Sequence, residues 1–294
     1  MVSSGPEPSR RWSADWSRPV EPVPPVVDVL VPTFDRPAEL AVTLAGLAAQ
    51  DDPPFRVTVS DQSDDGSAAR APAVEAMVRV LRAQGREVRM LRHLPRRGLA
   101  EHRQFLLDTA EADQVLFLDD DVWLEPGTLT RMSEALDRLG CGFVGSAPMG
   151  LSFLDDRRPH HQAPFEPWDG PVRPEHVRDD SPAIARASLH GAANLVHVAE
   201  GVQVPRDGWL PYKIAWIGAC TLLRRSALVE SGGFDFWRRL PPSHAGEDVA
   251  AQWRVMERHG AAGLLPSGAV HLEAPTTVPD RTVEARSVLF ADAP

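Results

Sequence analysis

The sequence contains very little lysine and cysteine and no long hydrophobic run, and each shortage excludes a class of protein. Of its 31 lysine and arginine residues only Lys213 is a lysine, so a mechanism that needs a catalytic lysine must use that residue. The two cysteines, Cys141 and Cys220, cannot form a disulfide framework, and neither has the spacing of a metal site. No apolar run approaches the roughly 18 residues of a membrane span, and the N-terminus lacks the apolar centre of a signal peptide. We therefore expect no integral membrane segment and a cytoplasmic location.

Charge and composition limit the partners and the domain organisation. The net charge of −10 disfavours nonspecific binding to nucleic acid, which relies on basic patches, so no nucleic-acid partner is expected. The length of 294 residues fits one large domain or two smaller ones. Residues 1–25 are rich in proline, serine and arginine, which predicts a disordered or extended N-terminal tail.

A second stretch of unusual composition lies in the middle of the chain. Residues 151–182 contain six prolines among Arg, His and Asp, which predicts an irregular loop of the kind that often forms a lid or contacts substrate. After it, residues 187–199 have a helical pattern that places His190, Asn194 and His197 on one face. That face would line an acceptor pocket or pack as an ordinary polar face.

The first half of the chain alternates between strand and helix patterns. Strands are expected at residues 26–31, 56–60, 87–91 and 115–118, and helices at residues 38–49, 73–83 and 99–110. The run from Val115 to Leu118 is continuously apolar, which is typical of a strand buried on both faces of a parallel sheet. The alternation predicts an α/β fold in which a mostly parallel, Rossmann-like sheet carries helices on both faces.

Three adjacent carboxylates, Asp119, Asp120 and Asp121, follow the most apolar of these strands. Neighbouring carboxylates repel one another, so a fold places them together when a cation or several hydrogen-bond donors compensate them. Asp35 and Asp61 also follow strands, and strand ends in such a sheet face one crevice. Carboxylate oxygens at this place suit Mg²⁺ or Mn²⁺ with a phosphate-bearing ligand. The alternative interpretation is a solvated acidic turn.

The chain resembles family 2 glycosyltransferases over residues 26–149 and 213–273. Their nucleotide-binding half is similar to VDVLVPTFDRP, VTVSDQSDDGS, RRGLAEHRQFLL and LFLDDDV, and their acceptor half to GACTLLRRSALVESGGFDFW, GEDVAAQWRVMERHG and AVHLE. The resemblance implies a glycosyltransferase A-type fold in a single large domain, in which residues 26–125 bind the nucleotide sugar and residues 126–294 the acceptor. It also implies transfer of a sugar, with inversion, from a nucleotide-diphosphate sugar to a hydroxyl acceptor.

The same resemblance assigns residues to the donor and the metal. Those assigned to the nucleotide sugar are Pro32, Thr33, Asp35, Asp61, Arg103, Asp119 and Asp120, with Asp61 at the base and Arg103 near the diphosphate. Asp121 is assigned to a Mn²⁺ or Mg²⁺ ion, which would stabilise the charge on the leaving diphosphate. His271 either completes the metal shell or is a partly buried structural histidine. Because Gln62 replaces an Asp found in many relatives, the nucleotide stays open among UDP, GDP and dTDP.

The acceptor half supplies the expected catalytic residues. A hydroxyl group is a poor nucleophile near neutral pH, so a carboxylate must take its proton. Asp248 matches the catalytic base of the family, and a position at the start of a helix would stabilise its charge. Glu247 is the alternative base or a helix-capping residue. Trp237, between Phe236 and two arginines, is assigned to the acceptor, since sugar rings stack on aromatic side chains.

Other functions fit the sequence less well. Asp119-Asp120-Asp121-Val122 also matches the signature of haloacid-dehalogenase-type phosphatases, but those place it on an early strand and use a later lysine. A nucleotidyltransferase that forms sugar nucleotides would need a glycine-rich, basic loop after the first strand, and PTFDRP is not one. A catalytically inactive sugar-nucleotide binder or scaffold would not need both the Asp triplet and Gly246-Glu247-Asp248. The sequence therefore favours a metal-assisted glycosyltransferase.

Overall fold

The computed structural model describes residues 13–17, 23–205 and 208–291. Most of the expected tail, residues 1–25, lies outside the described residues. The described part of the tail contains one 3-10 turn, η1 (Ser13–Asp15). None of the helices in the described ranges is both long and apolar enough to cross a membrane.

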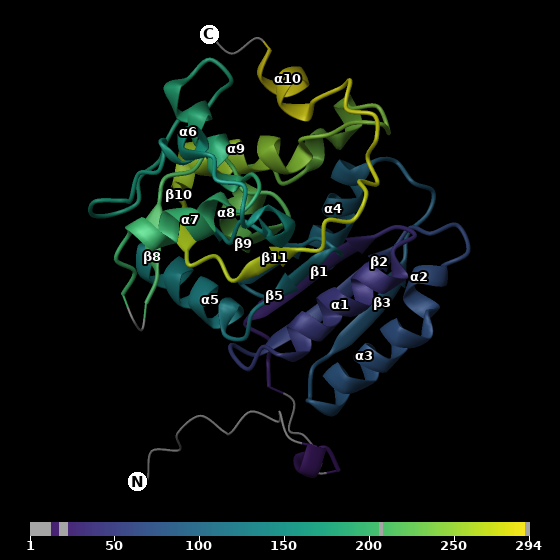
Figure 1. Ribbon diagram of the computed structural model, residues 1–294. Coiled ribbons are helices and arrows are strands. Elements are labelled where there is room, and N and C mark those ends of the chain that lie inside the picture. The colour runs from purple at the N-terminus through teal and green to yellow at the C-terminus, as the bar shows by residue number, and fades with distance from the viewer. Residues whose placement is uncertain (1–12, 18–22, 206–207, 292–294) are drawn as a thin grey trace.

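One eight-stranded sheet runs through both halves of the chain (Figure 1). Its order is β3 (Val88–Arg92), β2 (Phe55–Asp61), β1 (Val27–Thr33), β4 (Gln114–Leu118), β9 (Cys220–Arg224), β6 (Phe143–Gly145), β10 (Ala261–Leu265) and β8 (Leu210–Tyr212). The first four strands are parallel to one another, and β6 is parallel to β10. Strand β9 is antiparallel to β4 and β6, and β8 is antiparallel to β10. The predicted mostly parallel sheet is confirmed.

Helices cover both faces of this sheet, as the alternation of patterns predicts. On one face lie α1 (Pro37–Ala48), α3 (Pro72–Ala83) and α5 (Thr128–Leu139), and on the other lie α4 (Leu99–Asp108), α8 (Arg225–Glu230) and α9 (Glu247–His259). Strand β4 shows why both faces are apolar: Val115 and Phe117 pack into one core, and Leu116 and Leu118 into the other. Burying each such side chain contributes roughly 1.5–3 kcal/mol.

A second, three-stranded sheet extends from the end of the β4 strand. It contains β5 (Val122–Leu124), β11 (Ala269–His271) and β7 (Met149–Gly150) in that order. Strand β5 begins directly after Asp121, and its first residue, Val122, is paired with His271 at the end of β11. This register carries a residue from the far end of the chain to the Asp triplet.

The middle of the chain is built from short elements. They are η2 (Leu151–Phe153), α6 (Pro159–Gln162), η3 (Pro182–His190) and α7 (Asn194–Gly201). The single helix expected at residues 187–199 is wrong, because the chain is broken between η3 and α7. Ala192 has a φ of 54°, and its carbonyl accepts a hydrogen bond from Gly150 N–H at 2.9 Å. The break therefore follows from a contact with the β7 strand, which no local pattern reveals.

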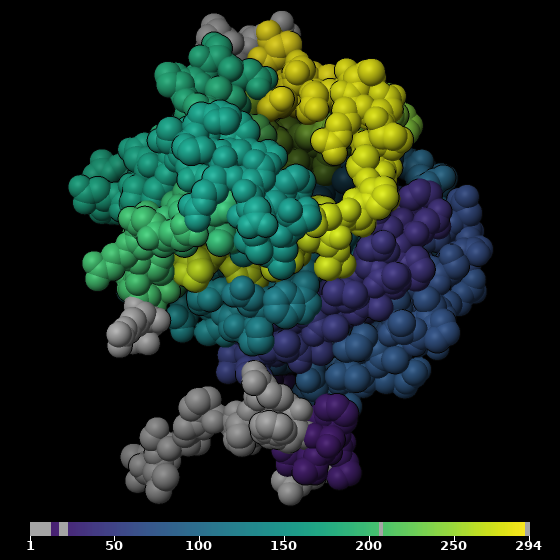
Figure 2. All heavy atoms as spheres, viewed as in Figure 1, coloured from purple at the N-terminus to yellow at the C-terminus, as the bar shows by residue number. Residues whose placement is uncertain are grey.

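Short segments complete the fold. They are α2 (Ser67–Arg70), η4 (Asp235–Arg239) and α10 (Ala285–Phe290), which packs on α9. Between β11 and α10, residues 272–284 run as an extended segment. Figure 2 shows this yellow segment lying against both the purple N-terminal strand region and the teal middle of the chain.

Gly98 fixes the start of α4 against the loop that leads to α9. Its φ is 103°, and a Cβ atom there would lie 2.4 Å from His244 Cε1 and 2.7 Å from the Pro242 carbonyl oxygen. His244 itself accepts a hydrogen bond from Ala100 N–H at 3.1 Å through Nε2. The close approach of this loop therefore requires glycine.

We expect Gly98→Ala to lower the free energy of unfolding by about 2–3 kcal/mol, because both the backbone strain and the clash must be relieved. Gly140→Ala is the matched control, since Gly140 has a φ of 63° with no atom within 4 Å of the added Cβ. It should cost about 1 kcal/mol from the backbone alone. Urea unfolding of both variants measures the difference, and equal losses would show that the His244 contact is unimportant.

Candidate functional site

The ends of three neighbouring strands bring the first candidate residues together. Thr33 at the end of β1 is in register with Asp61 at the end of β2, and β4 lies on the other side of β1. Pro32 is part of β1 and is buried. The Thr33 hydroxyl donates a hydrogen bond to Asp120 Oδ2 at 2.7 Å. The β1–α1 loop and the Asp triplet therefore lie together at one edge of the sheet, as the strand pattern predicts.

Arg103 on α4 joins the two halves of the chain at this site. Its Nη2 donates to Asp119 Oδ1 at 2.8 Å, and its Nε donates to Glu247 Oε1 at 2.9 Å. The Arg103 side chain is only 4% exposed. Burial lowers the pKa of this guanidinium, but Asp119, Glu247 and Asp248 outweigh that effect and raise it. Arg103 is therefore a permanent buried cation between β4 and the start of α9.

Arg36 is a site residue that the sequence analysis missed. Its Nη1 donates to Asp121 Oδ2 at 2.7 Å and to Asp120 Oδ1 at 3.1 Å, so one nitrogen bridges both carboxylates. Burial raises the pKa of Asp120 to about 7, although Thr33 and Arg36 act in the opposite direction. Burial, followed by repulsion from Asp119, also raises the pKa of Asp121. The sequence analysis expected a cation or hydrogen-bond donors to compensate the Asp triplet, and Arg36 is one such cation.

Asp121 and His271 are the residues that the sequence analysis assigned to a divalent cation. His271 Nε2 lies 3.8 Å from Asp121 Oδ2, and His271 Nδ1 accepts a hydrogen bond from Glu273 N–H at 2.7 Å. The neutral ring therefore carries its proton on Nε2, the nitrogen that faces Asp121. In the described ranges no three His, Cys, Asp or Glu side chains form a group that could hold a metal ion. Mg²⁺ often uses one or two carboxylates with water and phosphate oxygens, so the Asp121 carboxylate alone would suit a cation shared with a phosphate ligand.

Asp248 lies near the start of α9, in the first turn as expected. Its Oδ1 accepts a hydrogen bond from Val249 N–H at 2.8 Å. Burial, together with repulsion from Glu247 and Asp119, outweighs the attraction of Arg103 and raises the pKa of Asp248 to about 7. Asp248 also lines a small cavity of about 20 Å³, which is enough for about one water molecule. A carboxyl group with this pKa can take and release a proton near neutral pH.

Asp61 and its neighbours hold the loop after β2. The two Asp61 oxygens accept hydrogen bonds from Ser63 N–H at 2.7 Å and Ala69 N–H at 3.0 Å. The backbone N–H of Asp35, an exposed residue with a φ of 53°, donates to Ser63 Oγ at 3.0 Å. Gln62 N–H donates to the Thr33 carbonyl at 3.0 Å. The loops after β1 and β2 are therefore fastened together.

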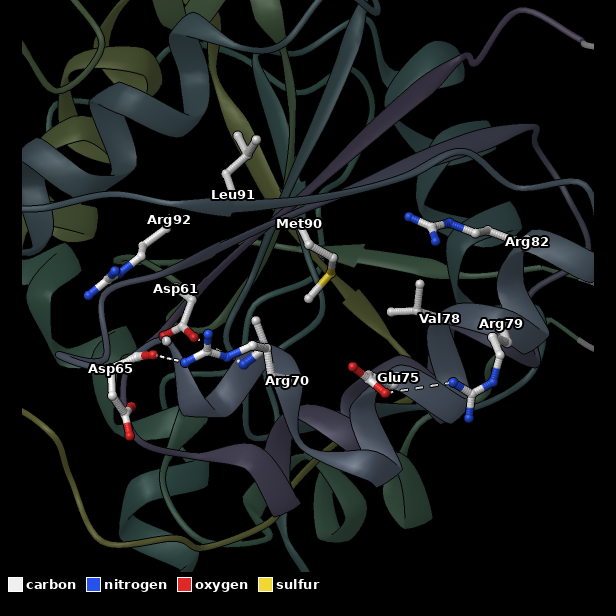
Figure 3. Close-up of a pocket in the computed structure, with 12 residues that line it drawn as sticks. Asp61, Asp65, Arg70, Glu75, Val78, Arg79, Arg82, Met90, Leu91 and Arg92 are labelled. Atoms are coloured by element: carbon white, nitrogen blue, oxygen red, sulfur yellow. Dashed lines mark hydrogen bonds and ion pairs between the residues drawn. The ribbon is translucent and has the colours of Figure 1, made fainter.

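A cleft of about 500 Å³ opens on the other side of Asp61, between β3 and the α2–α3 pair (Figure 3). Met90 and Val78 form an apolar part of its wall, and Arg79 on its rim pairs with Glu75 at 3.8 Å. Its lining does not include the Asp triplet or Arg103. This cleft is thus separate from the site at the strand ends, with Asp61 between them.

In the described part of the chain, no hydrogen bond or ion pair joins Trp237 to the other expected site residues. It lies in η4, where it is partly buried against the core, and the Arg238 guanidinium lies 4.9 Å from its ring centre. Helix α4, which carries Arg103, packs against η4. An acceptor role for Trp237 stays a prediction.

Comparisons with known proteins identify the family of the chain. Residues 28–198 match the family model described as Glycosyl transferase family 2. An uncharacterized protein of Mycobacterium tuberculosis is 25% identical over 238 residues, which cover 75% of this chain and 63% of that protein. The succinoglycan biosynthesis protein ExoM of Rhizobium meliloti is 33% identical over 121 residues, 40% of this chain and 37% of that protein.

Two solved structures share the fold. S. aureus TarS 1–349 has a TM-score of 0.53 and 17% identity, over 83% of this chain and 59% of that one. The mannosyltransferase PcManGT from Pyrobaculum calidifontis, in complex with GDP-Man and Mn²⁺, has a TM-score of 0.50 and 18% identity, over 85% of this chain and 61% of that one. This chain spans less than two thirds of the length of each of these four proteins.

Proposed function

Because the chain belongs to glycosyl transferase family 2, we propose that it transfers a sugar from a nucleotide-diphosphate sugar to a hydroxyl group, with inversion. The observation that carries this proposal is the chain of contacts from Asp119 through Arg103 to Glu247. It places the acidic start of α9 beside the strand ends where α/β sheets bind nucleotides. A donor site and a candidate base are thus adjacent.

The donor site is assigned to the loops after β1, β2 and β4. In this proposal Pro32, Thr33 and Asp35 contact the nucleotide, Asp61 contacts the base, and Asp119 and Asp120 contact the ribose and the diphosphate side. TarS has been solved in complex with UDP-GlcNAc and PcManGT with GDP-Man, which supports a nucleotide sugar as the class of donor. UDP, GDP and dTDP sugars are the candidates, and the cytoplasm is the proposed location.

Asp121 would hold a Mn²⁺ or Mg²⁺ ion with the diphosphate, and His271 would join it by exchanging the Nε2 proton, which its hydrogen bond from Glu273 N–H to Nδ1 favours, for the metal. When bound, such an ion stabilises the negative charge that develops on the leaving diphosphate. The Mn²⁺ in the PcManGT complex supports this part of the proposal. Arg103 would add a fixed positive charge near the same leaving group.

The proposed reaction assigns the proton to Asp248. The acceptor oxygen forms a bond with the anomeric carbon while the bond from that carbon to the diphosphate oxygen breaks, and the electron pair leaves with the diphosphate. The hydroxyl proton passes to an Asp248 carboxylate oxygen, and attack from the opposite face inverts the anomeric centre. Glu247 is engaged by Arg103, which supports Asp248 as the base. Trp237 is the proposed acceptor-stacking residue.

A panel of nucleotide sugars incubated with Mn²⁺ tests the function, with release of the nucleoside diphosphate as the measurement. We expect turnover with UDP-, GDP- or dTDP-linked sugars and none in excess chelator. Asp121→Ala should weaken Mn²⁺-dependent nucleotide binding at least roughly tenfold, because it removes a cation ligand. Asp137→Ala, which removes an exposed carboxylate on α5, is the control. Full turnover in excess chelator would contradict the cation assignment, and no turnover or nucleotide binding at all would contradict the function.

A further inference from the structure

The side chain of Arg36 occupies a position that a metal ion at Asp121 must share. Its Nη1 lies 2.7 Å from Asp121 Oδ2, the same oxygen that lies 3.8 Å from His271 Nε2. The Arg36 side chain is 12% exposed and Asp121 is 6% exposed, so water screens their attraction little. A divalent cation on this oxygen would therefore meet a positive charge already in contact with its ligand.

The loop around Arg36 is built to hold it there. Asp35, immediately before it, has a φ of 53°, a conformation that residues other than glycine seldom adopt. The Asp35 N–H is fastened to Ser63 Oγ at 3.0 Å. On the other side, Arg36 Nη2 donates to the carbonyl of Pro275 in the 272–284 segment. The guanidinium is thus held by the Asp triplet and by the C-terminal part of the chain.

If Arg36 leaves the two carboxylates, Asp120 and Asp121 keep different neighbours. Asp120 keeps its hydrogen bond from the Thr33 hydroxyl at 2.7 Å. Asp121 keeps His271, at 3.8 Å, as its neighbour. A buried, ionised carboxylate without a positive partner is strongly unfavourable, so an ionised Asp121 holds Arg36 until another cation arrives.

We propose that Arg36 is a built-in counter-ion of Asp120 and Asp121 that a divalent cation displaces, which makes metal binding depend on the nucleotide diphosphate. This inference rests on the proposed function. The metal alone must displace Arg36 and leave the guanidinium without an anion. When a nucleoside diphosphate is bound, its phosphate oxygens offer the guanidinium a new partner. Metal and nucleotide therefore bind with positive coupling.

Binding of Mn²⁺ alone, measured by electron paramagnetic resonance, tests this competition in wild type and in Arg36→Gln. The wild type should bind Mn²⁺ weakly, and UDP or GDP should tighten that binding about tenfold or more. Arg36→Gln should bind Mn²⁺ alone about tenfold more tightly than wild type, and the nucleotide should tighten that binding by a smaller factor than it does in wild type. Arg96→Gln is the matched control. The Arg96 guanidinium lies 4.0 Å from the ring centre of Phe34, which is in the same loop as Arg36, but Arg96 forms no hydrogen bond or ion pair with the Asp triplet.

The outcomes separate this inference from the proposed function. If Arg36→Gln binds Mn²⁺ no more tightly than Arg96→Gln, Arg36 does not compete and the inference is wrong, whatever the enzyme does. If Arg36→Gln binds Mn²⁺ but the wild type does not bind it even with nucleotide, Arg36 excludes the metal, and both the displacement inferred here and the cation assignment in the proposed function are wrong. If Arg36→Gln is too unstable for the binding measurement without metal, a second measurement compares how much Mn²⁺ raises the melting temperatures of the variant and the wild type. A rise no larger than that of wild type would overturn the inference.

Discussion

Replacing Asp248 by Asn is expected to reduce sugar transfer at least roughly 100-fold, because the amide cannot take the acceptor proton. The shape of the side chain is kept, and an amide oxygen can still accept the hydrogen bond from Val249 N–H. Binding of nucleotide and Mn²⁺ should change little, since these ligands are assigned to other residues. Single-turnover transfer and nucleotide binding, measured on the same samples, separate these effects.

The same variant should be more stable than the wild type at high pH. A carboxyl group whose pKa is raised by folding contributes stability that is present below its unfolded pKa and lost as pH rises through the folded value. For Asp248 these values are 3.8 and about 7. The wild type should therefore lose stability as pH rises between them, and Asp248→Asn should not lose this part. The expected gain for the variant above pH 7 is on the order of 2–4 kcal/mol.

The transfer activity of the wild type should rise with pH over the range in which its stability falls, because both effects depend on the ionisation of Asp248. The base must be ionised, so the transfer rate is expected to rise with pH and level off above about 7, the pKa of Asp248. Glu247→Gln is the control. If that variant loses transfer through the same pH dependence while Asp248→Asn keeps near-normal turnover, Glu247 is the base. If neither variant slows transfer, the inverting mechanism is wrong.

The fold of the first half could be predicted because its elements carry their own patterns. Leu40, Leu44 and Leu47 recur at helical spacing in α1, and each is buried in the core that the sheet shares with α1 and α3. Val115 to Leu118 is apolar at every position, which fits a strand with helices on both sides. Local periodicity is enough where each element contacts the sheet in the usual way.

Two features could not be predicted, because both depend on partners far away in the chain. The break between η3 and α7 depends on the contact of Ala192 with Gly150. Arg36 lies 84 and 85 residues from the carboxylates that it contacts, and one arginine in a loop forms no pattern. The available signal was indirect: three adjacent aspartates at a strand end require positive partners, and neighbouring strand-end loops face the same crevice.

Arg103→Met is expected to give the largest loss of stability, because it leaves two carboxylates, Asp119 and Glu247, without their buried cation. The side chains of Arg103 and Glu247 are 4% and 5% exposed, so water cannot replace the lost contact. Breaking a buried pair in this way typically costs about 3–5 kcal/mol. The loss should be greatest above about pH 7, because Asp248, whose pKa burial raises to about 7 and which Arg103 attracts, is also charged there.

The control for Arg103→Met is the same substitution at Arg254, an arginine whose ion pair is more exposed to solvent. Arg254 on α9 contacts Asp235 at 2.9 Å, and these side chains are 25% and 60% exposed. Arg254→Met should therefore cost less than about 1 kcal/mol. Urea unfolding of both variants on either side of neutral pH measures the contrast, and adding Glu247→Gln to Arg103→Met should restore part of the loss by removing one stranded charge. Equal costs for the two arginines, or no recovery in the double variant, would mean that the Asp119–Arg103–Glu247 contacts do not hold the two halves of the site together.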